Sequence, residues 1–552
     1  MIINPTIKNV TDRITKRSET TRSDYLEKMN GARKEGPRRA HLTCGNQAHA
    51  YAPVPEDQKR LIDEAGGNIG IINAYNDMLS AHQPFEKYPE IIKKAARLVG
   101  GTAQVAAGVP AMCDGITQGQ TGMELSLFSR DAIAMSAAIG LSHNVFDTTV
   151  YLGVCDKIVP GMIISAATFG HLPAVFLPAG PMSTGQSNDE KAKIRQDFAE
   201  GKANRSDLMA SEMASYHGPG TCTFYGTANT NQMLMEFMGL HLPGSSFVNP
   251  NTPLRDALTD FGAKHALSIS DLNSNYIPVS KILDEKAYVN GIVGLMATGG
   301  STNLLIHLIA MARASGIIID WSDFAEISKV IPLLAKVYPN GLADVNHFHA
   351  AGGLGLVITE LLGANLLHSD TQTIMGTGLE AYTKEPKIIN GELGWHSGVS
   401  SSLNSKIIST TSEPFQETGG LADLNGNLGS AVMKVSAVEK SRRKITAPVR
   451  VFNDQQSVID AFRAGEFTHD VIIAVRYQGP RANGMPELHN LTPSMSVLQS
   501  RGLKVALITD GRMSGASGKV PAAIHMSPEA LDEGPIAYLQ NGDIVTVDAI
   551  NG

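Results

Sequence analysis

Residues 147–162 read DTTVYLGVCDKIVPGM. A β-branched, apolar run leads into a cysteine, an aspartate and a lysine, and a Pro-Gly turn follows. Similar strand-like runs at 67–75 and 172–180 alternate with helical patterns at 129–141 and 231–242. Strands and helices that alternate in this way predict a mostly parallel sheet with helices on both faces. We therefore expect an α/β fold in the N-terminal part of the chain.

The sequence changes character near residue 385. From there to about 435 it is rich in Gly, Ser, Asn and Thr and weakly periodic, which is typical of a crossing between domains. Short strand-like runs follow at 447–452, 470–477, 504–510, 534–539 and 542–548. We expect an N-terminal, mostly parallel α/β sandwich domain over residues 1–385, with a helical arm over 1–40. A C-terminal β-rich, barrel-like domain is expected over 386–552, truncated at its end because the chain stops directly after a strand-like run.

Length, charge and hydropathy limit the class of protein. The chain has 552 residues, too many for one core, with 43% hydrophobic and 18% charged residues. Its net charge of -7 argues against a nucleic-acid partner. No run of about 20 apolar residues predicts a membrane span. The polar N-terminus lacks the apolar core of a secretory signal, so a cytoplasmic location is expected.

Reactive side chains recur in glycine-containing loops after apolar runs, where α/β folds build their sites. Thiolates favour iron–sulfur clusters or zinc, and carboxylates favour magnesium or manganese. The pattern indicates a soft metal site beside a hard one. Ordinary βα loops with incidental Cys and Asp are the alternative that spacing alone leaves open. The residues are Cys44, Cys113, Asp114, Cys155, Asp156, Lys157 and Cys222.

Two loops of the second half carry further candidates. Glu487 lies in a Gly/Pro-rich stretch, and Ser514 follows a strand-like run and Asp510-Gly511. This is not the GxSxG elbow of hydrolases, because Gly511 lies three residues before Ser514. A serine in such a turn is usually only a turn residue, and it acts as a base only if a nearby cation acidifies it. The absence of Walker A, GxGxxG and HExxH motifs indicates neither nucleotide nor zinc-protease chemistry.

Six segments together resemble the dihydroxyacid dehydratase / phosphogluconate dehydratase family. They are, in order, CDGITQGQTGMELSLFSRD, GVCDKIVPGM, GTCTFYGTANTNQM, TGGSTNLLIHL, GPRANGMPEL and TDGRMSG. The resemblance covers the chain from about residue 40 to its end. LTCGNQAHA, and Cys113 where other branches typically carry serine, favour the 6-phosphogluconate branch. The resemblance implies a hydro-lyase that dehydrates 6-phospho-D-gluconate to 2-dehydro-3-deoxy-6-phospho-D-gluconate, in the Entner–Doudoroff route of sugar breakdown.

The resemblance also implies an iron–sulfur cluster. Cys44, Cys155 and Cys222 match the family's three cluster ligands, which leave one iron open to act as a Lewis acid. Phosphogluconate dehydratases are associated with a [4Fe-4S] cluster and several relatives with [2Fe-2S], and the residues alone do not choose between them. Cys113 matches none of these ligands. We take it as a thiol near the site, with a fourth ligand as the alternative.

A Mg²⁺ site is implied by residues that match the family's magnesium ligands, Asp114, Asp156, Lys157 and Glu487. An ammonium cannot bind a cation, and in characterised relatives this lysine is carbamylated, which requires the neutral amine first. The alternative for Lys157 is a salt bridge to Asp156 or Asp114.

Ser514 matches the family's proposed base, so the catalytic residues implied are Ser514 and Lys157. The serine alkoxide would take the C2 proton of a magnesium-bound 2,3-dihydroxy acid, and the 3-hydroxyl would leave toward a cluster iron. A phosphate group also needs donors. The candidates for binding the substrate are Arg130, Ser301, Thr302 and Arg512, with Lys406 and Lys519 as further basic residues.

Two alternatives remain beside this interpretation. One is the same chemistry on a branched-chain dihydroxy acid or an unphosphorylated sugar acid. The other is an inactive sensor or binding protein that carries the cluster, against which Ser514, Glu487 and Asp156 argue. The expected partner is a small phosphorylated sugar acid, and the expected assembly is a homodimer.

Overall fold

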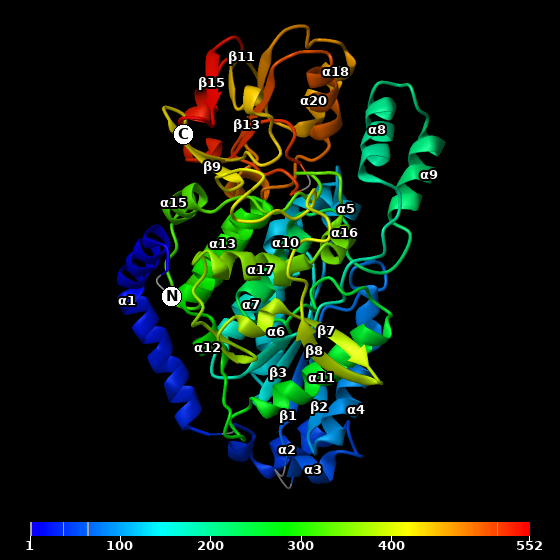
Figure 1. Cartoon of the computed structure of the whole chain (residues 1–552), viewed down its shortest axis with the longest axis vertical. Coiled ribbons are helices and arrows are strands. Elements are labelled where there is room, and N and C mark those ends of the chain that lie inside the picture. Colours follow the sequence, from blue (N-terminus) through cyan, green and yellow to red (C-terminus); the bar gives the residue numbers. More distant parts are fainter. Residues whose placement is uncertain (1–2, 37, 63–65, 516) are drawn as a thin grey trace.

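A parallel four-stranded sheet with the order β2-β1-β3-β4 lies in the N-terminal half of the computed structural model, which describes residues 3–36, 38–62, 66–515 and 517–552 (Figure 1). Its strands are β1 (Asn68–Asn73), β2 (Thr102–Gly108), β3 (Thr148–Leu152) and β4 (Ala174–Phe176). They alternate with the helices α4 (Tyr88–Leu98), α6 (Ser126–Leu141) and α7 (Ile158–Thr168). The predicted α/β alternation is thus confirmed. The chain passes from β1 to β2 on one side and then to β3 and β4 on the other, and ligands bind beyond the strand ends at such a reversal.

Helices cover both faces of this sheet. α4 packs against α11 (Pro253–Ser268), and α6 packs against α7. The second pair approaches closely because Gly161 has no side chain: a Cβ there would lie 2.6 Å from the carbonyl oxygen of Arg130 and 2.9 Å from Cβ of Ile133. α7 begins directly after Lys157, so this contact also fixes the loop that carries the Cys-Asp-Lys tripeptide.

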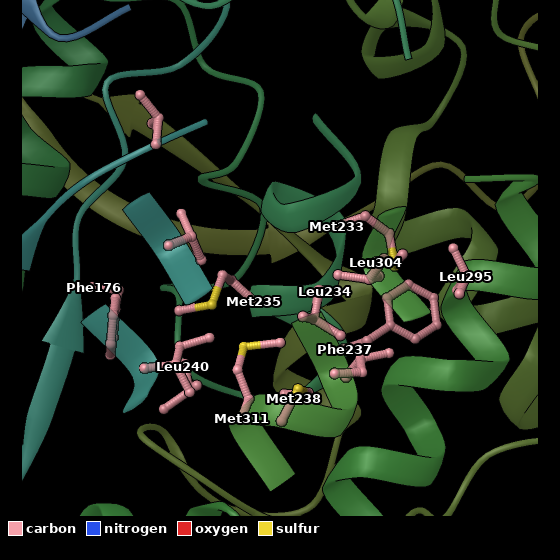
Figure 2. Packing of buried hydrophobic residues seen from close by; sticks show 14 of the residues in the cluster. Phe176, Met233, Leu234, Met235, Phe237, Met238, Leu240, Leu295, Leu304 and Met311 are labelled. Carbon is pink, nitrogen blue, oxygen red and sulfur yellow. The ribbon is translucent and has the colours of Figure 1, made fainter. Parts of the chain in front are cut away.

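The helix α10 (Thr227–Phe237) is buried along its whole length. Figure 2 shows its side chains, among them Met233, Leu234 and Phe237, packed with Leu295 and Leu304. These partners belong to α13 (Glu285–Thr298) and α14 (Asn303–Ala314), which both contact α10. A helix that is apolar or internally bonded all round is held rigidly, and the loop before it is held with it.

The N-terminal helix α1 (Pro5–Lys34) lies on the outside of α13 and α15 (Trp321–Val330) (Figure 1). Ile7, Val10 and Ile14 are fully buried at helical spacing. None of the helices in the described part of the chain combines the length and apolar character that a membrane-spanning segment needs.

A seven-stranded mixed sheet with the order β15-β11-β12-β13-β14-β10-β9 forms the C-terminal part. Its strands are β9 (Leu421–Gly426), β10 (Gly429–Lys434), β11 (Lys444–Phe452), β12 (Val471–Val475), β13 (Val505–Thr509), β14 (Ala522–Ser527) and β15 (Ile544–Asp548). The strands β11 to β14 run parallel, while the outer ones are antiparallel. The sheet is curled: a Cβ at Gly552, just after β15, would lie 3.3 Å from the carbonyl oxygen of Asp423 in β9. The β-rich, barrel-like expectation is confirmed.

Both faces of this sheet are buried at its centre. Along β12, Val471 and Ile473 belong to the main core of the protein, whereas Ile472 and Ala474 belong to a smaller core on the other face. Alternate residues of a strand point to opposite faces. The unbroken apolar run that this requires explains why the strand was recognisable from sequence.

Two expectations about this half are wrong in detail. Residues 534–539 were expected to form a strand, but Pro535–Tyr538 is a 3-10 helix, because proline fixes φ near the helical value and has no N–H for a ladder. The stretch 385–435 is also more ordered than its composition suggests. It contains most of the hairpin of β7 (Lys384–Ile389) and β8 (Glu392–Ser397), and the whole β9–β10 hairpin.

The close approach of α7 to α6 predicts the effect of Gly161→Ala. The new Cβ would clash with backbone, so α7 must shift, and we expect a loss of about 1–3 kcal/mol in the free energy of unfolding, as in other overpacked cores. Thermal unfolding measures this. Gly31→Ala in α1 is the matched control, because nothing lies within 4 Å of a Cβ there, and alanine should stabilise that helix by about 1 kcal/mol. Equal stability of the two variants would contradict the packing argument.

Candidate active site

Three carboxylates from distant parts of the chain meet in one buried place. Asp114 begins α5 (Asp114–Thr117) after β2, Asp156 follows β3, and Glu487 comes from the loop before α20 (Leu491–Ser500). One oxygen from each lies within 4.8 Å of the others. Figure 1 shows α5 at the junction with the C-terminal part. The structure thus brings together the carboxylates that the sequence predicts as magnesium ligands.

Two cations lie among these carboxylates. The Lys157 ammonium forms an ion pair with Asp114, and its Nζ is 3.5 Å from Oδ2 of Asp156. The Arg512 guanidinium donates to Oε1 of Glu487 at 2.7 Å and to Oδ2 of Asp114 at 3.2 Å. Both cations are almost completely buried. Lys157 is therefore a salt-bridge partner in this structure, which is the alternative that the sequence left open.

The charges of the five groups do not balance. Burial raises the pKa of Glu487 to about 7, and burial also raises the pKa of Asp156. Burial acts on Asp114 as well, but the charges of Lys157 and Arg512 outweigh it and lower the pKa of that carboxyl. Three acids against two bases leave one negative charge in excess when all are ionised. Such a site favours an added cation.

Two side-chain amide oxygens beside the carboxylates also favour an added cation. Gln118 and Asn303 donate through their nitrogens to Glu487, at 3.0 and 3.1 Å. Their oxygens, Oε1 and Oδ1, are buried and have no hydrogen-bond partner among the described residues. Unpaired buried acceptors are costly. Carboxylate and amide oxygens are the ligands that Mg²⁺ prefers, so these residues fit a magnesium ion.

Three of the four thiols lie near one another, and they are not the three that the sequence predicts as cluster ligands. Cys155 and Cys222 are partly exposed and lie close enough for the charge of Cys222 to raise the pKa of Cys155, after the larger effect of burial. Cys44 is exposed on α2 (Cys44–Tyr51), at the opposite end of the sheet. Cys113 lies beside Cys155 and Cys222 instead. The position of Cys113 directly before Asp114 was the signal in the sequence that could have shown that Cys113 lies near Cys155 and Cys222.

The Ser514 loop follows β13 and is pressed against the N-terminal half. Ser514 is partly buried. A Cβ at Gly515 would lie 2.5 Å from Oγ of Ser301 and 2.8 Å from the backbone nitrogen of Thr227, so only glycine fits. The Ser301 hydroxyl lies 2.8 Å from Oγ1 of Thr227 and accepts a hydrogen bond from the backbone N–H of Asn303. The loop that carries the predicted base is thus held against the first turn of α10.

The residues predicted to bind substrate have other partners in the structure. Arg512 is engaged by the two carboxylates, and Arg130 contacts Asp131 at 3.2 Å and Nδ1 of His307 at 3.5 Å. Thr302 lines a small cavity with Lys434, and none of the three carboxylates is among the residues that line it. Sequence reasoning missed Gln118 and Asn303, although a polar Asn303 opening an apolar helix was a usable signal.

Comparisons with known proteins agree with this architecture. Residues 67–382 match the model of the dihydroxy-acid/6-phosphogluconate dehydratase N-terminal domain, and residues 406–552 match that of the C-terminal domain. A phosphogluconate dehydratase of Rhizobium meliloti is 60% identical over 99% of this chain and 90% of its own length. Phosphogluconate dehydratases of Pseudomonas aeruginosa and Escherichia coli K12 are 59% and 56% identical, over 100% of this chain and 91% of their own lengths.

The buried ion pairs predict the effect of Arg512→Met. Asp114 and Glu487 would lose a cation without regaining water, so we expect unfolding free energy to fall by about 3–5 kcal/mol in EDTA. Chemical denaturation measures it. Arg481→Met is the control, since its pair with Asp532 is exposed and should change stability by less than about 1 kcal/mol. A loss at Arg512 no larger than at Arg481 would show that the cluster does not need the guanidinium.

Proposed function

The chain belongs to the dihydroxy-acid/6-phosphogluconate dehydratase family, and we propose that it is a hydro-lyase that converts 6-phospho-D-gluconate to 2-dehydro-3-deoxy-6-phospho-D-gluconate and water. Relatives named phosphogluconate dehydratase that share 56–60% of their residues over nearly the whole chain carry this proposal. The convergence of Asp114, Asp156 and Glu487 with the Ser514 loop supports it at the level of the site. A cytoplasmic location and a homodimer remain predictions from sequence.

The reaction removes a proton from C2 and hydroxide from C3 of a 2,3-dihydroxy acid. The two together make water, and the enol that remains tautomerises to the 2-keto-3-deoxy acid. Ser514 is the proposed base and would hold the C2 proton. The glycine that follows it fits so tightly against Ser301 and Thr227 that the serine has a fixed position relative to the carboxylates. Positioning of this kind supplies part of the rate enhancement.

We propose that Asp114, Asp156 and Glu487 hold Mg²⁺, with Lys157 as a further oxygen ligand when carbamylated. Bound there, the cation supplies positive charge that stabilises the developing enolate, usually by several kcal/mol. Arg512 favours the ionised form of Asp114 and Glu487 and orients both carboxylates through its hydrogen bonds. In the same way we propose an iron–sulfur cluster at Cys155 and Cys222, of the [4Fe-4S] type, whose open iron would supply a Lewis acid for the departing hydroxyl.

A phosphorylated substrate needs cations that are not already paired, and two lysines beside the site meet this condition. Lys191 is buried on α8 (Asn188–Ala199), with Nζ 5.2 Å from the ring of Tyr216 and 5.7 Å from that of Phe224, two residues after Cys222. Lys519 belongs to the Ser514 loop. Within the described residues neither lysine has a carboxylate at ion-pair distance, whereas Arg195 on the same helix is paired with Glu212. We propose that Lys191 and Lys519 receive the phosphate.

Burial and neighbouring charges support this assignment. Burial, and then the charge of Arg195, lower the pKa of Lys191, while the negative charge of Cys222 acts in the opposite sense. The Nδ1 atom of His489 lies 3.0 Å from Oγ of Ser517, two residues before Lys519, and His489 is also close enough to Lys191 to feel its charge. An anion placed here would offset a buried positive charge that has no carboxylate partner among the described residues. Unphosphorylated acids carry only their carboxylate and have no second anionic group to place beside these lysines.

Turnover with three substrates tests the proposed function. Anaerobically purified protein should form a keto acid from 6-phosphogluconate, and much less from gluconate or 2,3-dihydroxyisovalerate. Ser514→Ala should lower kcat by at least about 10²-fold with metal content unchanged, because it removes the proposed base. Keto acid from dihydroxyisovalerate alone would replace the substrate assignment. Loaded protein that turns over none of the three would favour the sensor class.

The phosphate assignment predicts a specific defect for Lys191→Met. KM for 6-phosphogluconate should rise about 10- to 100-fold, the range expected when a hydrogen bond to a charged group is lost, while any residual turnover of gluconate should not change. Steady-state kinetics with both acids measures this. Lys193→Met on the same helix is the control, because that side chain is exposed and paired with Asp197. Equal effects on both acids, or of both variants, would contradict the assignment.

A further inference from the structure

Three loops that each carry a cysteine are joined by polar contacts. The loop after β2 contains Cys113-Asp114, and the loop after β3 contains Cys155-Asp156-Lys157. The ion pair between Lys157 and Asp114 ties these two loops together. Cys113 therefore directly precedes Asp114, whose carboxylate is paired with Lys157 of the second loop.

The helix α10 ties the third loop to the second. The side-chain amide of Asn231 donates to the carbonyl oxygens of Cys155 and Asp156, both at 3.0 Å. The amide of Asn229, on the same helix, donates to the carbonyl oxygen of Cys222 at 2.6 Å and to that of Phe224 at 2.8 Å. Because α10 is buried throughout, both loops are fixed to one rigid element.

The backbone of Cys155 has an unusual conformation. Its φ is 74°, in the left-handed region that residues other than glycine rarely adopt. Conformations of this kind cost free energy and persist where the surroundings impose them, often at functional sites. Here the amide of Asn231 holds the carbonyl group of the strained residue and that of the residue after it.

The thiols of the three loops also interact electrostatically. Burial and then the charge of Cys113 raise the pKa of Cys222 to about 12. Burial, Cys113 and, less strongly, Cys222 raise the pKa of Cys155. These mutual effects place the three thiols near one another, in agreement with the contacts that join their loops.

Cys44 lies at the other end of the sheet. The helix α2 is held by Gln104 near the start of β2, which donates to the carbonyl oxygen of Ala50 at 3.0 Å. Figure 1 shows α2 beside the lower ends of β1 and β2, far from α5 and α10. Cys155 follows the carboxyl end of β3, whose five residues alone extend about 16 Å. Cys44 is moreover exposed, whereas the other three cysteines are partly buried.

We propose that Cys113, Cys155 and Cys222 are the three thiolate ligands of the iron–sulfur centre and that Cys44 is not a ligand. This rests on the cluster that belongs to the proposed function. It replaces the assignment of Cys44 made from sequence, and it gives a role to the one thiol that matched no expected ligand. The same βα loops then supply both centres, since Asp114 follows Cys113 and Asp156 follows Cys155.

Single Cys→Ser variants at positions 44, 113 and 155, purified anaerobically, test the assignment. Iron and acid-labile sulfide per chain and the visible absorption are measured for each. We expect Cys44→Ser to match the wild type, and Cys113→Ser to lose as much iron as Cys155→Ser. Circular dichroism and thermal unfolding show whether each variant is folded. Full iron in Cys113→Ser, or loss of iron in Cys44→Ser, would overturn the assignment.

Alkylation of the wild-type protein gives a second measurement that needs no variant. Anaerobic holoenzyme treated with iodoacetamide should be modified at Cys44 and protected at Cys113, Cys155 and Cys222, and removal of iron should expose all four. Rapid alkylation of Cys113 in the loaded protein would contradict the proposal. Wild-type protein without iron would overturn it together with the cluster of the proposed function, whereas loaded protein with an alkylated Cys113 would overturn it alone.

Discussion

Five ionisable groups share one buried volume, and the rest of the site depends on their balance. Asp114, Asp156 and Glu487 face Lys157 and Arg512, with one negative charge in excess. Burial of unpaired charge is costly, so each group needs its partners in place before the two halves of the chain can close on one another. Arg512 is decisive here because it belongs to the C-terminal part and bonds a carboxylate from each half. Assembly of the fold and assembly of the site are therefore the same event.

The buried helix α10 carries the second constraint. Six of its polar side chains are buried, and five of them form hydrogen bonds within the described part of the chain, as buried polar groups usually do. Asn229 and Asn231 use their amides to hold loop carbonyls, and Glu236 accepts from the backbone N–H groups of Gly244 and Ser246. The apolar side chains of the same helix pack against α13 and α14 (Figure 2). One helix thus fixes both thiol-bearing loops and the loop that contacts Ser514.

Sequence predicts those parts of the molecule that a local pattern determines. The apolar run of β3 and the reactive residues directly after it are an example, because parallel strands in a buried sheet require such runs and place their sites at the carboxyl ends. Cys44 shows the limit of this reasoning, because a thiol before a glycine looks the same at either end of a sheet, and only the packing of α2 decides which end it occupies. The sequence predicted Arg512 as a substrate-binding residue. Nothing in its local sequence shows that the carboxylates of Asp114 and Glu487 lie beside it in the fold. Lys191, which we propose as a phosphate ligand, lies in a polar helical stretch that gives no local signal of such a role.

The two proposed metal centres would meet at the tripeptide Cys155-Asp156-Lys157. Consecutive side chains in a regular turn would crowd a thiol and a carboxylate into one site, where their negative charges repel. The left-handed backbone at Cys155 changes the chain direction between them, and Lys157 is already at the start of α7 with its ammonium on Asp114. The thiol then faces Cys113 and Cys222, while the carboxylate and the amine face the acidic cluster. In the proposed assignment, the strain at this one residue is the cost of keeping a soft and a hard metal site adjacent without mixing their ligands.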